Sequence, residues 1–192
     1  MPIVELHVLE GYGPQEKQRL HKGLTDAVRL VVPASPDTIT VLVHEMKSED
    51  YSRGGRNREG APALPEAGDL VRSFLAAMEA RDLEKAQSML GEGFTMHFPG
   101  AEPMHHLEEL ISWARPRYRF VKKTYEGFDV MQGPGAETLV YCRGTLSGEW
   151  LDGSLFDGVR FIDRFEIEGG LLRRQDVWNY MAETVASRAP TI

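Results

Sequence analysis

The sequence lacks several features that would direct it to particular classes of protein. Its 192 residues include a single cysteine, Cys142, so no disulfide can form within the chain and a reducing compartment, the cytoplasm, is expected. No apolar run approaches the roughly 20 residues of a membrane span, and no signal-peptide pattern is evident at the start. The formal net charge of −7 disfavours nucleic acid as the main partner, because phosphates require a basic surface.

Sequence motifs for cofactors and metals are also missing. There is no phosphate-binding loop, no dinucleotide fingerprint and no haem or iron–sulfur spacing, so we expect a small-molecule substrate without a cofactor. The spacing of His97, His105 and His106 matches no tetrahedral metal site, and prolines lie between them. Cys142 is interpreted as a small apolar strand residue.

The first 46 residues predict a β-α-β unit. Residues 3–9 (IVELHVL) and 38–44 (TITVLVH) are rich in β-branched and apolar side chains, which is typical of strands. Between them, apolar residues recur on one helical face: Leu20, Leu24, Ala27, Val28 and Val31. A connection of this length permits parallel pairing of the two strands.

A polar stretch rich in Gly, Pro and Arg, residues 47–66, contains the best domain boundary. We predict a first domain over residues 1–58, a linker over 59–66 and a second domain over 67–192. The second domain begins with amphipathic helices, one of them capped by Asp82, and ends in a run of long strands. This order predicts an α+β domain with a curved antiparallel sheet.

Pro2 stands directly behind Met1 and directly ahead of the first predicted strand. Proline has no backbone N–H and is tolerated at the start of a strand, so a purely structural interpretation stays open. If Met1 is removed, Pro2 becomes a secondary amine, and its pKa starts from the α-amino range of about 7.7–8.0. Burial or a neighbouring cation would lower that pKa toward the range in which a general base works at neutral pH.

The opening stretch resembles the 4-oxalocrotonate tautomerase family. The resemblance rests on PIVELHVLEG, the amphipathic helix, VLVHEM and a Gly-Gly pair in the next loop, and covers residues 2–55. It implies a β-α-β fold, a homo-oligomer (a hexamer or a dimer-based assembly) and active sites built between subunits. It also implies keto–enol tautomerisation of a small carbonyl acid, with Pro2 as general base and acid.

Two arginines that recognise the dicarboxylic substrate of this family are replaced here, by Tyr12 and Thr40, while Tyr51 matches an aromatic position of the family. A dicarboxylate is therefore not the expected substrate. Arg53, or one of the next two arginines of the loop, is expected to bind one carboxylate. Tyr12 and Tyr51 are expected to donate hydrogen bonds to an enolate oxygen. The alternative for the arginines is a solvated linker.

Residues 66–186 resemble the cone of nuclear-transport-factor-2-like (NTF2-like) proteins, the fold of ketosteroid isomerases and SnoaL-type polyketide cyclases. The resemblance rests on LVRSFLAAMEARDLEKAQSMLGEGFTMHFPGAEP at the start of the segment and FIDRFEIEGGLLRRQDVWN near its end. It implies helices packed on a curved sheet. Enzymes, binding proteins and dimerisation modules all use this fold, so the fold does not determine the function.

Residue by residue, the ketosteroid isomerase pattern is only partly kept. Its general base falls at His97, its oxyanion-binding aspartate at Asp163 and a tyrosine of its first helix at Phe74. We therefore do not expect steroid isomerisation, but a His97–Asp163 pair facing one cavity would form an acid–base set. His97 is also compatible with a hydrogen-bonded core histidine. Four further residues are expected around the pocket: Tyr125, Tyr141, Asp176 and Trp178.

Three functions remain open from the sequence. In the first, the protein is an isomerase in which Pro2 catalyses keto–enol tautomerisation of a small 2-oxo acid. In the second, the cone is the active part, a cyclase or isomerase using His97 and Asp163, and the tautomerase-like unit only assembles the oligomer. In the third, the protein binds a small hydrophobic molecule without catalysis.

Overall fold

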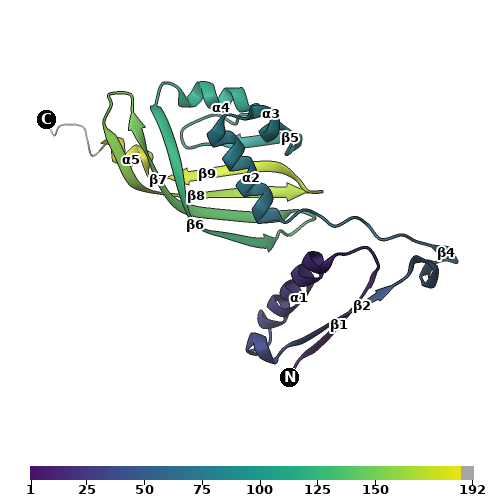
Figure 1. Ribbon diagram of the computed structural model, residues 1–192. Coiled ribbons are helices and arrows are strands. Elements are labelled where there is room, and N and C mark those ends of the chain that lie inside the picture. The colour runs from purple at the N-terminus through teal and green to yellow at the C-terminus, as the bar shows by residue number, and fades with distance from the viewer. Residues whose placement is uncertain (187–192) are drawn as a thin grey trace. The chain divides into compact units, whose positions relative to one another are not determined.

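A computed structural model describes residues 1–186 and confirms the predicted α+β class (Figure 1). The chain divides into two compact units, and the division follows Leu64. No helix within the described residues is long and apolar enough to cross a membrane.

The first unit is a β-α-β arrangement. Its elements are β1 (Ile3–Leu9), α1 (Pro14–Arg29) and β2 (Thr40–Met46). The strands pair in parallel, an arrangement that the length of the connection permits, and the register places His7 opposite His44. Pro14 lies in the first turn of α1, where the missing N–H has no intrahelical partner to lose.

Helix α1 covers one face of this two-stranded sheet. Lys17 of α1 forms an ion pair of 2.6 Å with Glu45 of β2, which lies on the covered face. Residues of β1 alternate between half-buried and exposed, because successive side chains of a strand point to opposite faces. The helix-free face therefore carries exposed apolar side chains, including Ile3 (58% exposed) and Leu42 (41%).

Short elements flank and follow β2. These are the 3-10 helices η1 (Pro36–Thr38) and η2 (Ser48–Asp50) and the strands β3 (Ser52–Arg53) and β4 (Arg56–Asn57). Gly54 and Gly55 connect β3 to β4 with φ angles of 59° and 73°, which a two-residue hairpin turn requires and which glycine adopts without strain.

The second unit places helices against a five-stranded sheet of order β5-β9-β8-β7-β6. The helices are α2 (Ala67–Ala80), α3 (Leu83–Gln87), α4 (Leu107–Ala114) and α5 (Met181–Ala186). The strands are β5 (Leu90–His97), β6 (Tyr118–Gln132), β7 (Thr138–Trp150), β8 (Leu155–Glu168) and β9 (Leu171–Asn179). The four long strands are antiparallel, whereas β5 joins the edge of β9 in parallel. Asp82 caps α3 as predicted, since its side chain accepts a hydrogen bond from the Lys85 N–H at 3.1 Å.

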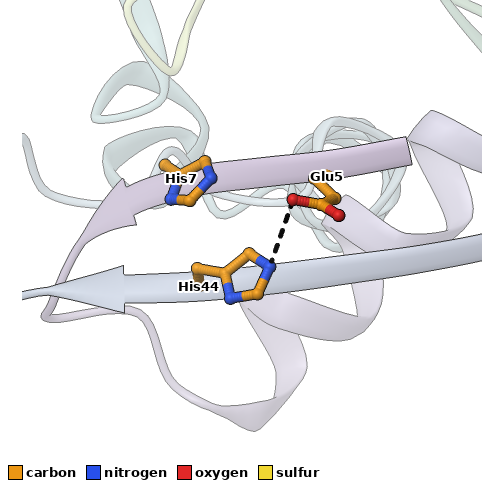
Figure 2. A group of neighbouring side chains, drawn as sticks. All are labelled: Glu5, His7 and His44. Atoms are coloured by element: carbon orange, nitrogen blue, oxygen red, sulfur yellow. Dashed lines mark ion pairs between the residues drawn. The ribbon is translucent and has the colours of Figure 1, made fainter. Parts of the chain in front are cut away.

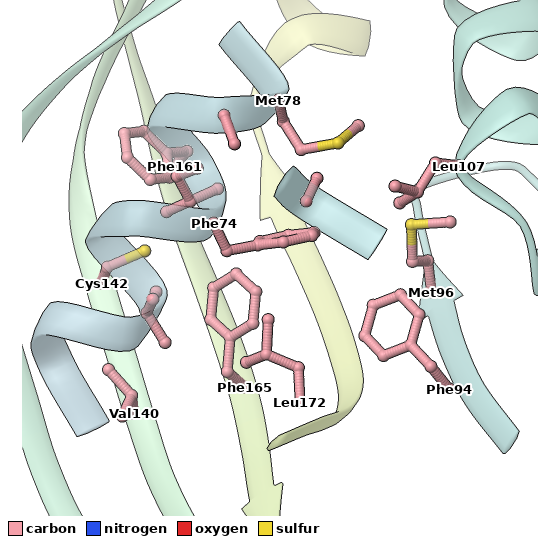
Figure 3. Close-up of a cluster of buried hydrophobic side chains, with 14 of the residues drawn as sticks. Phe74, Met78, Phe94, Met96, Leu107, Val140, Cys142, Phe161, Phe165 and Leu172 are labelled. Carbon is pink, nitrogen blue, oxygen red and sulfur yellow. The ribbon is translucent and has the colours of Figure 1, made fainter. Parts of the chain in front are cut away.

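The hydrophobic core lies between α2 and the sheet (Figure 3). Phe74 of α2 packs edge-on against Phe94 of β5 and Phe165 of β8, with ring centroids 6.2 and 6.1 Å apart. Phe165, Val140 and Leu172 are completely shielded from solvent. Cys142 is equally buried, as expected of an apolar strand residue. Burial raises the pKa of its thiol to about 12, so at neutral pH it is not a nucleophile.

Candidate active sites

Pro2 lies one residue ahead of β1 and is half-buried. Its carbonyl oxygen accepts a hydrogen bond from the Thr40 N–H at 3.0 Å, so Thr40 holds Pro2 through the backbone at the start of β2. Met1 is 88% exposed. While Met1 is attached, the Pro2 nitrogen is an amide and cannot accept a proton, so a catalytic Pro2 requires the loss of Met1.

Three other predicted residues of this unit, Tyr12, Tyr51 and Arg53, line one open pocket of about 630 Å³. Arg53 Nε donates a hydrogen bond of 2.8 Å to the Tyr51 hydroxyl, which orients both side chains. The Tyr12 hydroxyl donates to the Ala61 carbonyl at 3.1 Å. Arg58 lines the same pocket and places a second cation there.

This pocket and Pro2 lie at opposite ends of β1. The seven residues of β1, at roughly 3.3 Å each, span about 23 Å from Pro2 to the segment that carries Tyr12, and the last three of them, residues 7–9, line the pocket. Within one chain, the structure therefore brings Tyr12, Tyr51 and Arg53 together but keeps Pro2 and Thr40 apart from them. No small enol acid spans this distance.

The cone contains a cavity of about 390 Å³ between α2, α4 and the sheet. Its walls are largely apolar, and three predicted residues line it: Phe74, Tyr125 and Asp163. Burial raises the pKa of the Tyr125 hydroxyl, which therefore remains a hydrogen-bond donor at neutral pH. Two polar residues that the sequence reasoning missed, Lys123 and Gln175, also face this cavity.

Asp163, Lys123 and Gln175 form a polar cluster inside the apolar cavity. Asp163 is completely buried, and its Oδ2 pairs with the Lys123 ammonium and accepts a 3.3 Å hydrogen bond from Gln175 Nε2. The other oxygens of the cluster, Asp163 Oδ1 and Gln175 Oε1, are buried and have no partner among the described residues. Because a buried acceptor without a partner is costly, these two oxygens are positioned to accept hydrogen bonds from a bound molecule.

His97 does not join Asp163, contrary to the expected acid–base pair. Met96 points into the core, so the next residue of β5 points to the opposite face of the sheet. There the His97 Nδ1 lies 3.1 Å from Oδ1 of Asp176, its partner in the parallel register between β5 and β9. The pair His97–Asp176 is therefore outside the cavity that contains Asp163.

Three more predicted pocket residues belong to this outer face. Asp176 accepts hydrogen bonds from Arg164 (3.0 Å) and Arg174 (2.9 Å), so it takes part in an ion-pair network. Tyr141 lies opposite Arg164 in the register between β7 and β8. Trp178 is 51% exposed and does not line the cavity. The expectation that Tyr141, Asp176 and Trp178 surround the cone pocket is not met, because alternation along each strand sends them to the other side.

His105 and His106, considered from the sequence together with His97 as metal ligands, contribute backbone N–H groups at the start of α4. His106 precedes α4, and Glu109 accepts hydrogen bonds from the backbone N–H groups of His105 (2.6 Å) and His106 (2.8 Å). These two bonds stabilise the carboxylate and lower the pKa of Glu109. His105 and His106 thus contribute to the start of a helix.

Comparison with known proteins defines the family of the first unit. The family model described as tautomerase enzyme matches residues 2–58. A probable tautomerase of Halalkalibacterium halodurans is 36% identical over 56 residues, which cover 92% of that protein and 29% of this chain. The chain belongs to the tautomerase family. A second family member, the 2-hydroxymuconate tautomerase of Bacillus subtilis, is 34% identical over 56 residues, which cover 90% of it and 29% of this chain.

The fold of the second unit has its own relatives. An NTF2-like protein of Burkholderia thailandensis superposes with a TM-score of 0.53 and 13% identity, covering 66% of this chain and all of that structure. At this identity the likeness shows the fold alone. This member of the tautomerase family therefore joins a tautomerase unit to an NTF2-like cone, as the two resemblances implied, and the family relationship supports isomerase chemistry in general.

Proposed function

We propose that this protein catalyses keto–enol tautomerisation of a small 2-oxo acid, with Pro2 as general base and acid. The observation that carries the proposal is the position of Pro2, directly ahead of β1 in a β-α-β unit of the tautomerase family and fixed by the Thr40 N–H. After loss of Met1, the neutral secondary amine takes a proton from the substrate. The ammonium so formed returns it to another atom of the same conjugated system, so no cofactor is needed.

We further propose that each active site forms between two copies of the chain. Pro2 lies at one end of β1, and the hydrogen-bond donors and cations lie about 23 Å away at the other end, so a neighbouring copy must supply one half. The Arg53 guanidinium would bind the substrate carboxylate, and the Tyr51 hydroxyl would stabilise the enolate oxygen.

Burial supports self-association of the first unit. None of its residues 1–64 is buried in the single chain, and Ile3 and Leu42 expose apolar surface on the helix-free face. A unit of about 60 residues without a buried core is marginal by itself, and association of copies is the usual remedy.

The test begins with the intact mass, which reports whether Met1 has been lost. Turnover of phenylenolpyruvate is then measured for the parent chain and for Pro2→Ala. We expect a loss of at least a hundredfold in kcat/KM with unchanged folding. Asp163→Asn is the matched control, since it alters a carboxylate of the cone, and it should retain turnover. Retention of Met1 together with full activity of Pro2→Ala would overturn the proposal.

Mixing two inactive variants tests the site between copies. Pro2→Ala and Arg53→Ala are co-expressed so that they assemble together. If one copy supplies Pro2 and its neighbour supplies Arg53, about a quarter of the sites in a random mixture are intact and activity returns. Sites contained within single chains would give no recovery.

A second function is favoured by the unpaired oxygens in the cone. We propose that the cone cavity binds a small, mostly apolar molecule with a hydroxyl that donates to Asp163 Oδ1 or Gln175 Oε1 and a carbonyl that accepts from Lys123. Of the two residues in the cyclase or isomerase alternative, Asp163 remains part of this proposed site. His97 does not, and Lys123 is the polar partner of Asp163 in its place. The same assay distinguishes catalysis in the cone from binding alone. A turnover that is lost in Asp163→Asn but kept in Pro2→Ala would assign catalysis to the cone.

A further inference from the structure

Three potential metal ligands gather on the helix-free face of the first unit, and one of them, His7, also lines the pocket of Arg53. Figure 2 shows Glu5 and His7 on β1 and His44 on β2. Glu5 and His7 are two residues apart and thus share a face, and His44 lies directly opposite His7 in the parallel register. One ligand atom from each residue lies within 4.8 Å of the other two.

The contacts within this cluster leave its ring nitrogens available. The imidazoles of His7 and His44 stack with centroids 4.7 Å apart and an angle of 18° between the planes. His44 Nε2 lies 3.8 Å from Glu5 Oε2, which is too long for a hydrogen bond. No lysine or arginine among the described residues pairs with Glu5.

We propose that Glu5, His7 and His44 bind a divalent transition metal of the zinc type. Two imidazoles and one carboxylate form a ligand set that zinc uses with a water or substrate in the fourth position. Tetrahedral bonds of about 2.0–2.1 Å place ligand atoms roughly 3.4 Å apart, so atoms that now lie within 4.8 Å of one another must approach by up to about 1.4 Å. Exposed side chains achieve this by rotation, and the side chains of His44 and Glu5 are 46% and 58% exposed.

The site includes none of the residues to which we assign roles in tautomerisation, although it shares the helix-free face that we propose for contact between copies, and His7 borders the Arg53 pocket. Alternation along β1 places Glu5 and His7 on the face that α1 leaves open, whereas the proposed catalysis uses Pro2 at the strand start and side chains beyond its end. The sequence signal was present as a Glu-x-His pair in the first strand and one His in the second. It could not be recognised without the register, since a shift of one residue would place His44 on the opposite face.

The experiment titrates ZnCl2 into the chelator-treated full-length protein in a calorimeter. We expect one zinc ion per chain, release of protons, and weaker binding at about pH 5, where imidazoles are protonated. His7→Ala and His44→Ala should each weaken binding by roughly tenfold or more, and Glu5→Gln by a smaller factor. Cobalt(II) bound to the same site should give the visible absorption of a tetrahedral ion.

Two controls keep this outcome specific. His21→Ala removes an exposed histidine of α1 outside the cluster and should leave zinc affinity unchanged. Pro2→Ala should also leave it unchanged, which separates this result from the tautomerase assay. Absence of zinc binding, or equal affinities of the parent chain and of His7→Ala and His44→Ala when circular dichroism shows them folded, would overturn the proposal.

Discussion

The two units of this chain differ in how much apolar surface they bury within a single chain. The cone buries aromatic and aliphatic side chains between α2 and its sheet, with Phe74, Val140 and Phe165 almost or completely removed from water. The tautomerase unit buries none of its residues within a single chain. The cone therefore has a buried core of its own, whereas a single copy of the first unit leaves much of its apolar surface exposed.

The candidate sites follow the same division. The cone holds an ionised cluster inside an apolar cavity, where Asp163 and Lys123 have to satisfy each other. The first unit places Pro2, the Arg53 pocket and the Glu5–His7–His44 cluster at its ends and on its open face. The cone cluster is formed within one chain, whereas we propose that the sites of the first unit are completed by another copy or by an ion.

Removal of a core ring tests the cone most severely. Phe165→Ala should lower the free energy of unfolding by about 3–5 kcal/mol, because a cavity replaces a fully buried ring. Trp113, Trp150 and Trp178 all lie in the second unit, so tryptophan fluorescence in urea reports this loss. Ile162→Ala, at 38% exposed on the same strand, should cost less than about 1 kcal/mol. Equal losses would mean that the core is not where the structure places it.

Breaking the buried ion pair should be nearly as damaging. Lys123→Met leaves the Asp163 carboxylate buried without its cation and should cost about 3 kcal/mol in urea unfolding. Adding Asp163→Leu should recover most of this loss, because the uncompensated charge is gone. Arg143→Met breaks the exposed pair with Asp129 and should cost below about 1 kcal/mol. Additive losses in the double variant would contradict this account of the pair.

A charge on the helix-free face tests the dependence of the first unit on neighbouring copies. Leu42→Glu adds a carboxylate beside the exposed Glu5 and should shift the oligomer toward smaller species in sedimentation, with parallel loss of enol turnover. The urea midpoint of tryptophan fluorescence should not change. Leu64→Glu, at another exposed leucine, is the control and should leave sedimentation as in the parent. Unaltered assembly of Leu42→Glu would remove this face from the interface.

The smallest expected effect concerns the start of α4. Two backbone N–H groups hold the pKa of Glu109 below its usual value, and the folded state is favoured when this carboxyl is ionised. Its contribution is therefore fully present above the unfolded pKa of about 4.3 and is lost as the pH falls through the lower folded pKa. An NMR titration of the Glu109 carboxyl should give a midpoint below the usual value of a glutamate, and a midpoint at or above that value would refute the assignment.

Much of the fold was accessible from the sequence because it depends on local signals. Alternation located β1, the apolar periodicity located α1, and Asp82 marked the start of α3. The bounds shifted by a residue or two: the second strand begins at Thr40 and not at Thr38, because Pro36–Thr38 forms a 3-10 turn. The parallel attachment of β5 to β9 was not anticipated, since these strands lie far apart in the sequence.

The cone site was less predictable because it depends on strand phase. Lys123 alternates with Val121 and Tyr125 in the sequence, which was the available signal that it faces the cavity. A register irregularity between Tyr125 and Gly127 then changes the phase along β6. Another irregularity precedes Thr95 in β5, so matching His97 to a family position did not establish the face to which it points.

The sequence by itself determined the β-α-β order, the division into two units that resemble different families, and the position of Pro2 ahead of the first strand. Each of these features depends on residues that are contiguous in the chain. Only the tertiary structure decided which titratable groups meet. In the structure Asp163 pairs with Lys123, His97 lies beside Asp176 and not beside Asp163, and Glu5 and His7 lie beside His44. Side chains on neighbouring strands meet according to register, and a shift of one residue reverses every face.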